Sequence, residues 1–284
     1  MKQVELKVYA KINISLDIVG VKDDRHLLDS VLNSVSIFDE IVVKKTEDSG
    51  VSVYANGEDF SCSNAYKSAI LMQKHFNLGG FSVEIKQNIP SGGGLGGSSA
   101  DSAGVIRAIE KLFNLQVDKD ELCKLALQIG SDVPYMLFGG LCRLRGVGDV
   151  LNFYDYRGEE EILLCGVGEV STAKCFALYD EIKPSICANN DALIDAMLNN
   201  KPLRDCKEYF VNALLDGAVV LNGAIETILS SMRASGLCAC MSGSGAYCFG
   251  VGESVDIERA EKLLAENGIK CIRAKTKSCG IEFV

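Results

Sequence analysis

Residues 90–102, PSGGGLGGSSADS, place five glycines directly before a run of small, hydroxyl-bearing residues. Glycine has no side chain to keep a ligand off the backbone, and it allows positive φ, at which successive N–H groups can converge on an anion. The preceding FSVEIKQNIP alternates apolar residues as a strand does, and the residues after the loop have helical spacing as far as Phe113. A strand, a glycine loop and a helix N-terminus in this order predict a phosphate site.

The loop matches neither of two common phosphate-binding patterns. Gly97 is followed by Ser98 and Ser99, where the P-loop pattern requires lysine. Gly92, Gly94 and Gly97 fit the dinucleotide pattern GxGxxG only loosely, and no nucleotide-binding βαβ unit precedes them. Without its neighbours, the loop is also compatible with a flexible connector or a tight turn between a strand and a helix.

Composition argues against several classes of protein. The chain has 284 residues, is 48% hydrophobic and carries a net charge of −9, with no tryptophan and no basic stripe, which argues against nucleic-acid binding. No apolar run reaches the length of a membrane span and the start has no secretory core, so we expect a cytoplasmic protein without membrane association, a monomer or homodimer. Twelve scattered cysteines without a CxxC pair predict a reducing compartment and no zinc site.

Predicted strands and helices alternate along the chain without internal repeats. The expected strands cover 4–19, 28–37, 40–45, 50–55, 81–89, 162–167, 239–241, 247–252 and 271–274. The expected helices cover 64–76, the segment from the glycine loop to 113, 118–129, 173–179, 191–198, 219–234 and 257–267. A polar, charged break at 157–161 predicts an N-terminal domain of residues 1–157 and a C-terminal domain of residues 158–284.

Three further segments carry residues suited to chemistry. Lys11 and Asn13 interrupt an apolar strand, and a buried lysine is costly without an anionic partner, although Lys11 could instead extend from an edge strand to solvent. Asp132 precedes the apolar segment VPYMLFGG and could act as a general base or as a helix cap. Residues 241–245, MSGSG, could close over a phosphate or substrate from the second domain, or form a hairpin turn.

Together these segments resemble the GHMP family of small-molecule kinases. The resemblance is carried by AKIN (10–13), PSGGGLGGSSADS (90–102), GSDVPYMLFGG (130–140) and MSGSGAYCFGV (241–251), in that order, and it covers nearly the whole chain. It implies an α/β fold of the α+β type in two domains, an N-terminal ATP-binding domain and a C-terminal GHMP kinase domain, with the active site in the cleft between them.

The same resemblance implies ATP and Mg²⁺ as cofactors, with no residue assigned to the metal. Asp132 would be the base, and Lys11 beside it would keep Asp132 ionised. The residues implied to bind ATP are Pro90, Gly92, Gly93, Gly94, Leu95, Gly96, Gly97, Ser98, Ser99 and Asn64. The residues implied to bind the small-molecule substrate are Asn13, Arg25, His26, Phe176, Ser242 and Gly243.

Details of the motifs bear on the substrate. GGGLGGSS, RGVGD (145–149) and VSTA (170–173) are most similar to the family members that phosphorylate a cytidine-diphosphate sugar alcohol on the non-mevalonate route to isoprenoid precursors. In those members a tyrosine and a histidine hold the cytosine. Here Arg25 stands in place of the tyrosine, although a guanidinium can also stack on a base, and His26 could be a surface or capping residue. The alternatives are a kinase for homoserine, mevalonate or a sugar, or a non-catalytic nucleotide-binding relative.

Overall fold

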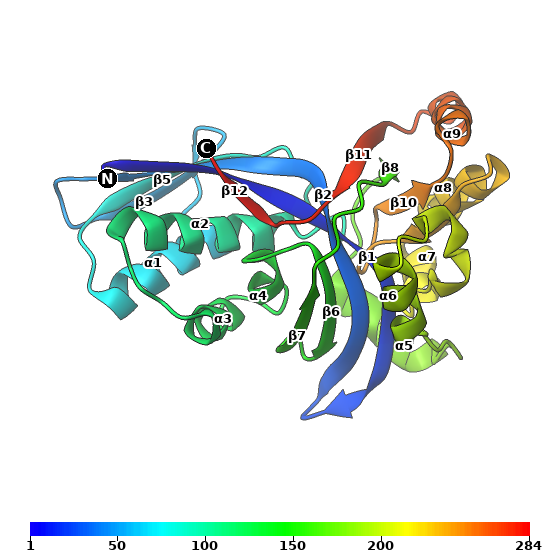
Figure 1. The fold of residues 1–284 in the computed structure, drawn as a ribbon, viewed down its shortest axis with the longest axis horizontal. Helices are drawn as coiled ribbons and strands as arrows, with labels where there is room; N and C mark the ends of the chain where they lie inside the picture. Colours follow the sequence, from blue (N-terminus) through cyan, green and yellow to red (C-terminus); the bar gives the residue numbers. More distant parts are fainter.

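Two long antiparallel strands run through the centre of the computed structural model, which describes all residues 1–284 (Figure 1). β1 (Gln3–Lys22) and β2 (Arg25–Lys45) pair along almost their whole length. Asp23 and Asp24 join them with φ of 50° and 57°, the backbone of a two-residue turn that suits the right-handed strand twist. The prediction of separate strands over 28–37 and 40–45 was wrong, because β2 continues through both.

The other elements follow the predicted alternation closely. The remaining strands are β3 (Val51–Ala55), β4 (Glu58–Asp59), β5 (Phe81–Lys86), β6 (Leu141–Gly146), β7 (Val150–Tyr154), β8 (Glu161–Cys165), β9 (Cys238–Met241), β10 (Cys248–Val251), β11 (Cys271–Lys277) and β12 (Ile281–Phe283). The helices are α1 (Asn64–Phe76), α2 (Gly97–Phe113), α3 (Lys119–Leu127), α4 (Val133–Met136), α5 (Thr172–Ile182), α6 (Asn190–Leu198), α7 (Leu215–Leu221), α8 (Ala224–Ala234) and α9 (Ser254–Glu266), with 3-10 turns η1 (Leu203–Asp205) and η2 (Lys207–Tyr209).

Two kinds of difference from the prediction have local causes. The helix expected over 219–234 is interrupted at Asn222 and Gly223, where the Asn222 side chain accepts a hydrogen bond from the N–H of Ala224 and starts α8. The strands β4, β6, β7 and β12 and the one-turn helix α4 were not predicted, because short elements show too little periodicity. At α3 the prediction is confirmed, since Asp118 caps the helix by accepting from the N–H of Glu121 at 2.8 Å.

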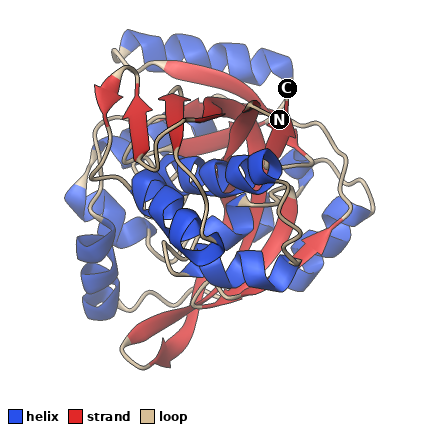
Figure 2. Cartoon of the chain, turned by 90° about the vertical axis from the view of Figure 1, so that its left-hand side faces the viewer, coloured by secondary structure: helices blue, strands red, loops and turns tan.

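One strand joins the two halves of the sheet. The strands follow the order β4-β3-β5-β2-β11-β8-β10-β9, and β11 pairs with β2 at one end and with β8 at the other. Helices α1 and α2 cover the sheet of the N-terminal half, while α7, α8 and α9 lie at the other end of the molecule (Figure 1). The tip of the β1–β2 hairpin projects from the body in both views (Figure 1, Figure 2).

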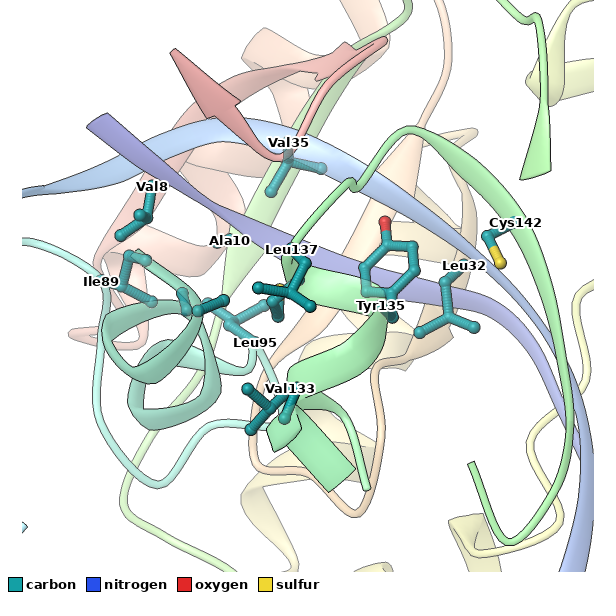
Figure 3. Packing of buried hydrophobic residues seen from close by; sticks show 14 of the residues in the cluster. Val8, Ala10, Leu32, Val35, Ile89, Leu95, Val133, Tyr135, Leu137 and Cys142 are labelled. Carbon is teal, nitrogen blue, oxygen red and sulfur yellow. The ribbon is translucent and has the colours of Figure 1, made fainter. Parts of the chain in front are cut away.

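The apolar core forms a larger and a smaller cluster, which share a strand. The larger cluster lies between the N-terminal sheet and its helices and includes Leu95 of the glycine loop; Figure 3 shows its centre, with Leu95 drawn between the strands and α4. In β8, Ile162 belongs to the larger cluster and Leu163 to the smaller, because successive strand residues face opposite sides. β12 pairs with β1, so the last strand returns to the N-terminal half. The boundary at residues 157 and 158 stays a prediction.

None of the helices combines the length and the apolar character needed to cross a bilayer.

The crossing of α2 over the sheet depends on a glycine. A Cβ on Gly104 would overlap Cγ1 of Val8 and Cδ1 of Ile41. We expect Gly104→Ala to lower the free energy of unfolding by about 2 kcal/mol, because overpacking costs about 3 kcal/mol and the better helix propensity of alanine returns about 1 kcal/mol. Urea denaturation would measure this. Gly79→Ala is the control, since an added Cβ there has no atom within 4 Å, and an equal loss in both variants would contradict the packing argument.

Candidate active site

The glycine loop has the backbone expected of an anion site. Gly92, Gly94 and Gly96 adopt φ of +64°, +75° and +77°, a region that L side chains rarely occupy. α2 begins at Gly97, so the N–H groups of its first turn have no acceptor within the helix and carry a partial positive charge. The predicted order of strand, loop and helix is confirmed, although β5 ends at Lys86 and not at Pro90.

Backbone and side-chain hydrogen bonds hold the loop between two other segments. On one side, the N–H of Lys11 donates to the carbonyl of Leu95 at 3.0 Å. On the other, the Ser242 hydroxyl donates to the carbonyl of Gly94 at 3.0 Å and accepts from the N–H of Asn13 at 3.2 Å. The MSGSG segment is the turn of the β9–β10 hairpin, as one of its two predicted roles requires, and it also contacts the glycine loop, while its closing over a phosphate or substrate stays a prediction. Hydrogen bonds therefore join three distant parts of the chain: β1, the glycine loop and the MSGSG turn.

A buried amide orients the MSGSG turn. The Asn212 side chain donates to the carbonyls of Met241 at 2.8 Å and Gly243 at 2.9 Å, and it accepts from the N–H of Leu214 at 3.0 Å. Because it is 2% exposed, these hydrogen bonds replace those that water would otherwise make. Gly243 and Leu214 line the cavity described below, so Asn212 fixes part of its wall.

The contact between the loop and this turn leaves no space for a side chain. A Cβ on Gly94 would overlap the carbonyl oxygen of Ser242 and lie 3.3 Å from the backbone nitrogen of Gly245. We expect Gly94→Ala to weaken ATP binding about 30-fold, because positive φ and a clash with backbone together cost about 2 kcal/mol. Calorimetric titration with ATP would measure this. Gly79→Ala, at a glycine outside the cavity lining where an added Cβ has no atom within 4 Å, is expected to bind as the unaltered protein does, and equal affinities in all three proteins would contradict the argument.

Lys11 and Asp132 meet across the cavity. Lys11 Nζ lies 3.4 Å from Oδ2 of Asp132 and donates to Oδ1 of Asn13 at 2.6 Å. The lysine side chain is 4% exposed and the aspartate 34%, so the alternative in which Lys11 extends to solvent is wrong. Asp132 stands at the first position before α4, yet its side chain makes no capping hydrogen bond and is free to face Lys11. The pair places a carboxylate, open to the cavity, against a buried cation.

A cavity of about 580 Å³ surrounds this pair and the glycine loop. The predicted site residues that line it are Lys11, Pro90, Gly92, Gly93, Gly94, Gly96, Gly97, Ser98, Ser99, Asp132, Phe176 and Gly243. The predicted site residues outside its lining are Asn13, Arg25, His26, Asn64, Leu95 and Ser242. Leu95 is fully buried in the core. Asn64 and Ser98 both border an adjacent cavity, and Nδ2 of Asn64 lies 3.5 Å from Oγ of Ser98. Segments from both halves of the chain thus form one site.

Sequence reasoning missed several lining residues. Thr172 and Ser244 line the cavity from the C-terminal half, and their hydroxyl oxygens are 2.8 Å apart. Thr172 stands in the motif VSTA and Ser244 in the motif MSGSG. The available signal was a hydroxyl-bearing residue inside a motif that the sequence had already singled out. Asp39 and Gln87 also line the cavity, and the acidic pair Asp39 and Glu40 inside the apolar strand segment SIFDEIVV was the signal for Asp39.

Asp39 belongs to a pair of buried carboxyls below the loop. Burial raises the pKa of the Asp39 carboxyl, although its oxygen accepts hydrogen bonds from the N–H groups of Ile89 at 2.7 Å and Asn88 at 2.5 Å, which lower it. Burial raises the pKa of Asp101 well above its usual range, and the charge of Asp39 raises it further. Two adjacent carboxylates cannot both ionise easily, so burial and the neighbouring charge favour the protonated form of Asp101.

The implied cytosine-binding residues lie at the edge of the site. The His26 ring stacks at a tilt on Phe176, with ring centroids 4.8 Å apart, and its Nε2 lies 2.7 Å from Oδ1 of Asp180. Phe176 lines the cavity, so His26 reaches it only through that ring. Arg25 pairs with Lys22 at the exposed tip of the β1–β2 hairpin, away from the cavity lining.

Comparison with known proteins matches this arrangement. Two family models match, GHMP kinases N terminal domain over residues 63–140 and GHMP kinases C terminal over residues 182–270. The 4-diphosphocytidyl-2-C-methyl-D-erythritol kinase of Clostridium novyi (strain NT) is 37% identical over 86% of this chain and 89% of its own, and that of Acetivibrio thermocellus is 31% identical over 95% and 96%.

Solved structures show the same fold. A crystal structure of 4-(cytidine 5'-diphospho)-2C-methyl-D-erythritol kinase superposes with a TM-score of 0.80 at 27% identity, over 96% of this chain and 98% of the other. A homoserine kinase from Cytophaga hutchinsonii superposes with a TM-score of 0.78 at 16% identity, over 100% and 98%, which shows the common fold alone. The matched family models and the similarity along the chain establish that this protein belongs to the GHMP kinase family.

Proposed function

We propose that this protein transfers the γ-phosphoryl group of ATP to a hydroxyl of 4-diphosphocytidyl-2-C-methyl-D-erythritol, a step in making isoprenoid precursors. The observation that carries the proposal is the Lys11–Asp132 pair, 3.4 Å apart, in the same cavity as the glycine loop. A phosphate site beside a paired carboxylate suits transfer to a hydroxyl. The choice of alcohol rests on the named relatives at 31% to 37% identity.

The reaction needs positioning and charge stabilisation more than covalent chemistry. The N–H groups of the glycine loop and of the first turn of α2 would hold the phosphates of ATP. Asp132 would accept the proton of the attacking hydroxyl, since it is the partly exposed member of the pair. Lys11, held by Asn13 at 2.6 Å, would stabilise the negative charge that develops on the attacking and transferred oxygens.

The remaining substrate residues have two proposed roles. Phe176 and, behind it, His26 would hold the cytosine, because they present a stacked aromatic surface at the cavity edge. Asn13 and Ser242 lie outside the cavity lining and would act by orienting Lys11 and the glycine loop, while Gly243 would contact substrate directly. Arg25 would reach the base only by a movement of the hairpin tip.

Other parts of the proposal concern the setting of the reaction. Mg²⁺ would be bound with the phosphates of ATP, as it commonly is in phosphoryl-transfer sites, and no cluster of three or more His, Cys, Asp or Glu side chains that could hold a metal is present. Residues 1–157 and 158–284 would form the two domains on either side of the site. We propose that the enzyme acts in the cytoplasm as a monomer or homodimer.

An assay of ADP release tests the function. Purified protein with Mg²⁺ and ATP would be offered 4-diphosphocytidyl-2-C-methyl-D-erythritol, homoserine, mevalonate and a sugar in parallel. We expect turnover of the cytidyl substrate alone. The position of Arg25, exposed and outside the cavity lining, favours the second candidate, a kinase for another small alcohol, and turnover of homoserine or mevalonate in place of the cytidyl compound would select it. Nucleotide binding without turnover of any alcohol would support a non-catalytic relative.

A further inference from the structure

The buried carboxyl pair below the glycine loop has no part in the proposed chemistry. Asp39 and Asp101 are each 1% exposed, and their hydrogen-bond donors in the rest of the chain are neutral. Gln87 Nε2 donates to Oδ2 of Asp101 at 2.8 Å, while Oδ1 of Asp101 has no hydrogen-bond partner. Burying two carboxyls without a cation is expensive, so the pair requires a compensating role.

The contacts of the pair connect the two ends of the glycine loop. Asp39 holds the N–H groups of Asn88 and Ile89, and Asp101 holds the side chain of Gln87, so all three residues before Pro90 are bound. Asp101 itself stands in α2, just after Ser98 and Ser99, which line the cavity. Asp39 and Gln87 line the same cavity, so the pair lies directly beneath the site.

We propose, on the basis of the proposed function, that Asp39 and Asp101 are positioning residues for ATP: Asp39 holds the N–H groups of Asn88 and Ile89, Asp101 holds the side chain of Gln87, and together they fasten the start of the glycine loop to β2 and to the helix that follows the loop. Glycine loses more backbone freedom on ordering than any other residue. A loop with five glycines binds phosphate well only if its ends are already fixed, because ordering it at binding would reduce affinity. Because the raised pKa of Asp101 favours its neutral form, the two carboxyls place less negative charge under the phosphates than two carboxylates would.

Substitution of Asp101 separates this role from general stability. We expect Asp101→Leu, which removes the acceptor of the Gln87 side chain, to weaken ATP binding about tenfold in calorimetric titration, a cost of about 1.4 kcal/mol. Asp101→Asn keeps a side chain of the same size with an oxygen that can accept from Gln87, and it is expected to restore affinity to within about threefold of the unaltered protein. Ser102→Ala is the matched control, because Ser102 is the next buried residue of α2 and its hydroxyl donates only to the carbonyl of Ser98 at 2.8 Å.

The pH dependence supplies a readout that a structural role would not change. Asp101 holds its proton at low pH and loses it as the pH rises through its raised pKa, which adds a second negative charge below the phosphates. Asp39 is the charged group facing Asp101. The other charged groups on the surrounding elements have partners of their own, Glu40 with Lys86, Arg107 with Glu110, Lys67 with Asn64, and Lys11 with Asn13 and Asp132. We therefore expect ATP affinity to fall as the pH rises through the raised pKa of Asp101, and to fall less in Asp101→Asn.

ATP binding can be measured without an alcohol substrate, so this test of the positioning role does not depend on which alcohol the enzyme phosphorylates. Equal affinity for ATP in Asp101→Leu and the unaltered protein, or the same pH profile in the unaltered protein and Asp101→Asn, would refute the positioning role. If Asp101→Leu does not fold, as thermal melting would show, the pH comparison with Asp101→Asn decides alone. A folded, unaltered protein that binds no ATP would instead refute the proposed function.

Discussion

Replacing Asp132 by asparagine is expected to lower kcat by about 10³-fold, because a positioned general base contributes roughly 10² to 10⁴ in rate. The substitution keeps the size and shape of the side chain and removes the charge that would accept the hydroxyl proton. Since its side chain makes no capping hydrogen bond, the change leaves α4 intact. ATP affinity is expected to stay within about twofold, which assigns the loss to the transition state and not to nucleotide binding.

The measurement is the rate of ADP release at saturating ATP and acceptor, with ATP affinity measured separately. Asp155→Asn is the matched control, because Asp155 is exposed and pairs with Arg157 at 3.0 Å on the surface. We expect that variant to turn over at the unaltered rate. If Asp132→Asn retained most of its activity, the proton would have to leave by another route, and the role proposed for Asp132 would be wrong.

Replacing Lys11 by methionine is expected to lower kcat by about 10² to 10³-fold, the effect of removing one group that stabilises charge in a transition state. Methionine has a volume similar to that of lysine. The volume matters because the side chain of Lys11 packs closely against Gly96, where an added Cβ would lie 3.2 Å from Cγ of Lys11. The change also leaves Oδ1 of Asn13 without its donor in a buried place, which costs about 1 to 3 kcal/mol of stability.

Two measurements separate these effects. Turnover is expected to fall far more than the fraction of folded protein, which thermal melting would follow in parallel. Lys44→Met is the control, because Lys44 is an exposed lysine of β2 whose Nζ lies 3.4 Å from Oε1 of Glu84. A Lys11→Met variant that is folded and fully active would show that the lysine only compensates the charge of Asp132, and the proposed mechanism would lose its electrostatic component.

Local features of the fold could be predicted from the sequence. The helix over Asn64–Phe76 and the start of α2 after the glycine loop are confirmed, because apolar spacing and glycines act within a few residues. The cap at Asp118 is confirmed for the same reason. At Asp132 the same residue type before a helix makes no cap, because its backbone is already helical, with φ of −86° and ψ of −16°, whereas the backbone of Asp118 is extended, and the Asp132 side chain faces Lys11 instead.

The site itself required more than local patterns. The order of the motifs indicated the GHMP kinase family, and the family models confirm it. Residues such as Thr172 and Asp39 were missed because their neighbours in space are far away in the chain. His26 and Arg25 were predicted together, yet one stacks on Phe176 and the other lies at the exposed hairpin tip, because successive strand residues point to opposite faces.

The sequence alone determined the glycine loop, the helix behind it and the family, since each depends on backbone freedom and on the spacing of residues within one segment. The tertiary structure decided which residues from other parts of the chain lie beside the loop. It brought Lys11 to 3.4 Å from Asp132, set Ser242 on the carbonyl of Gly94, and buried Asp39 against Asp101. These contacts join residues far apart in the chain, and they form only when the whole sheet and its helices pack around one core.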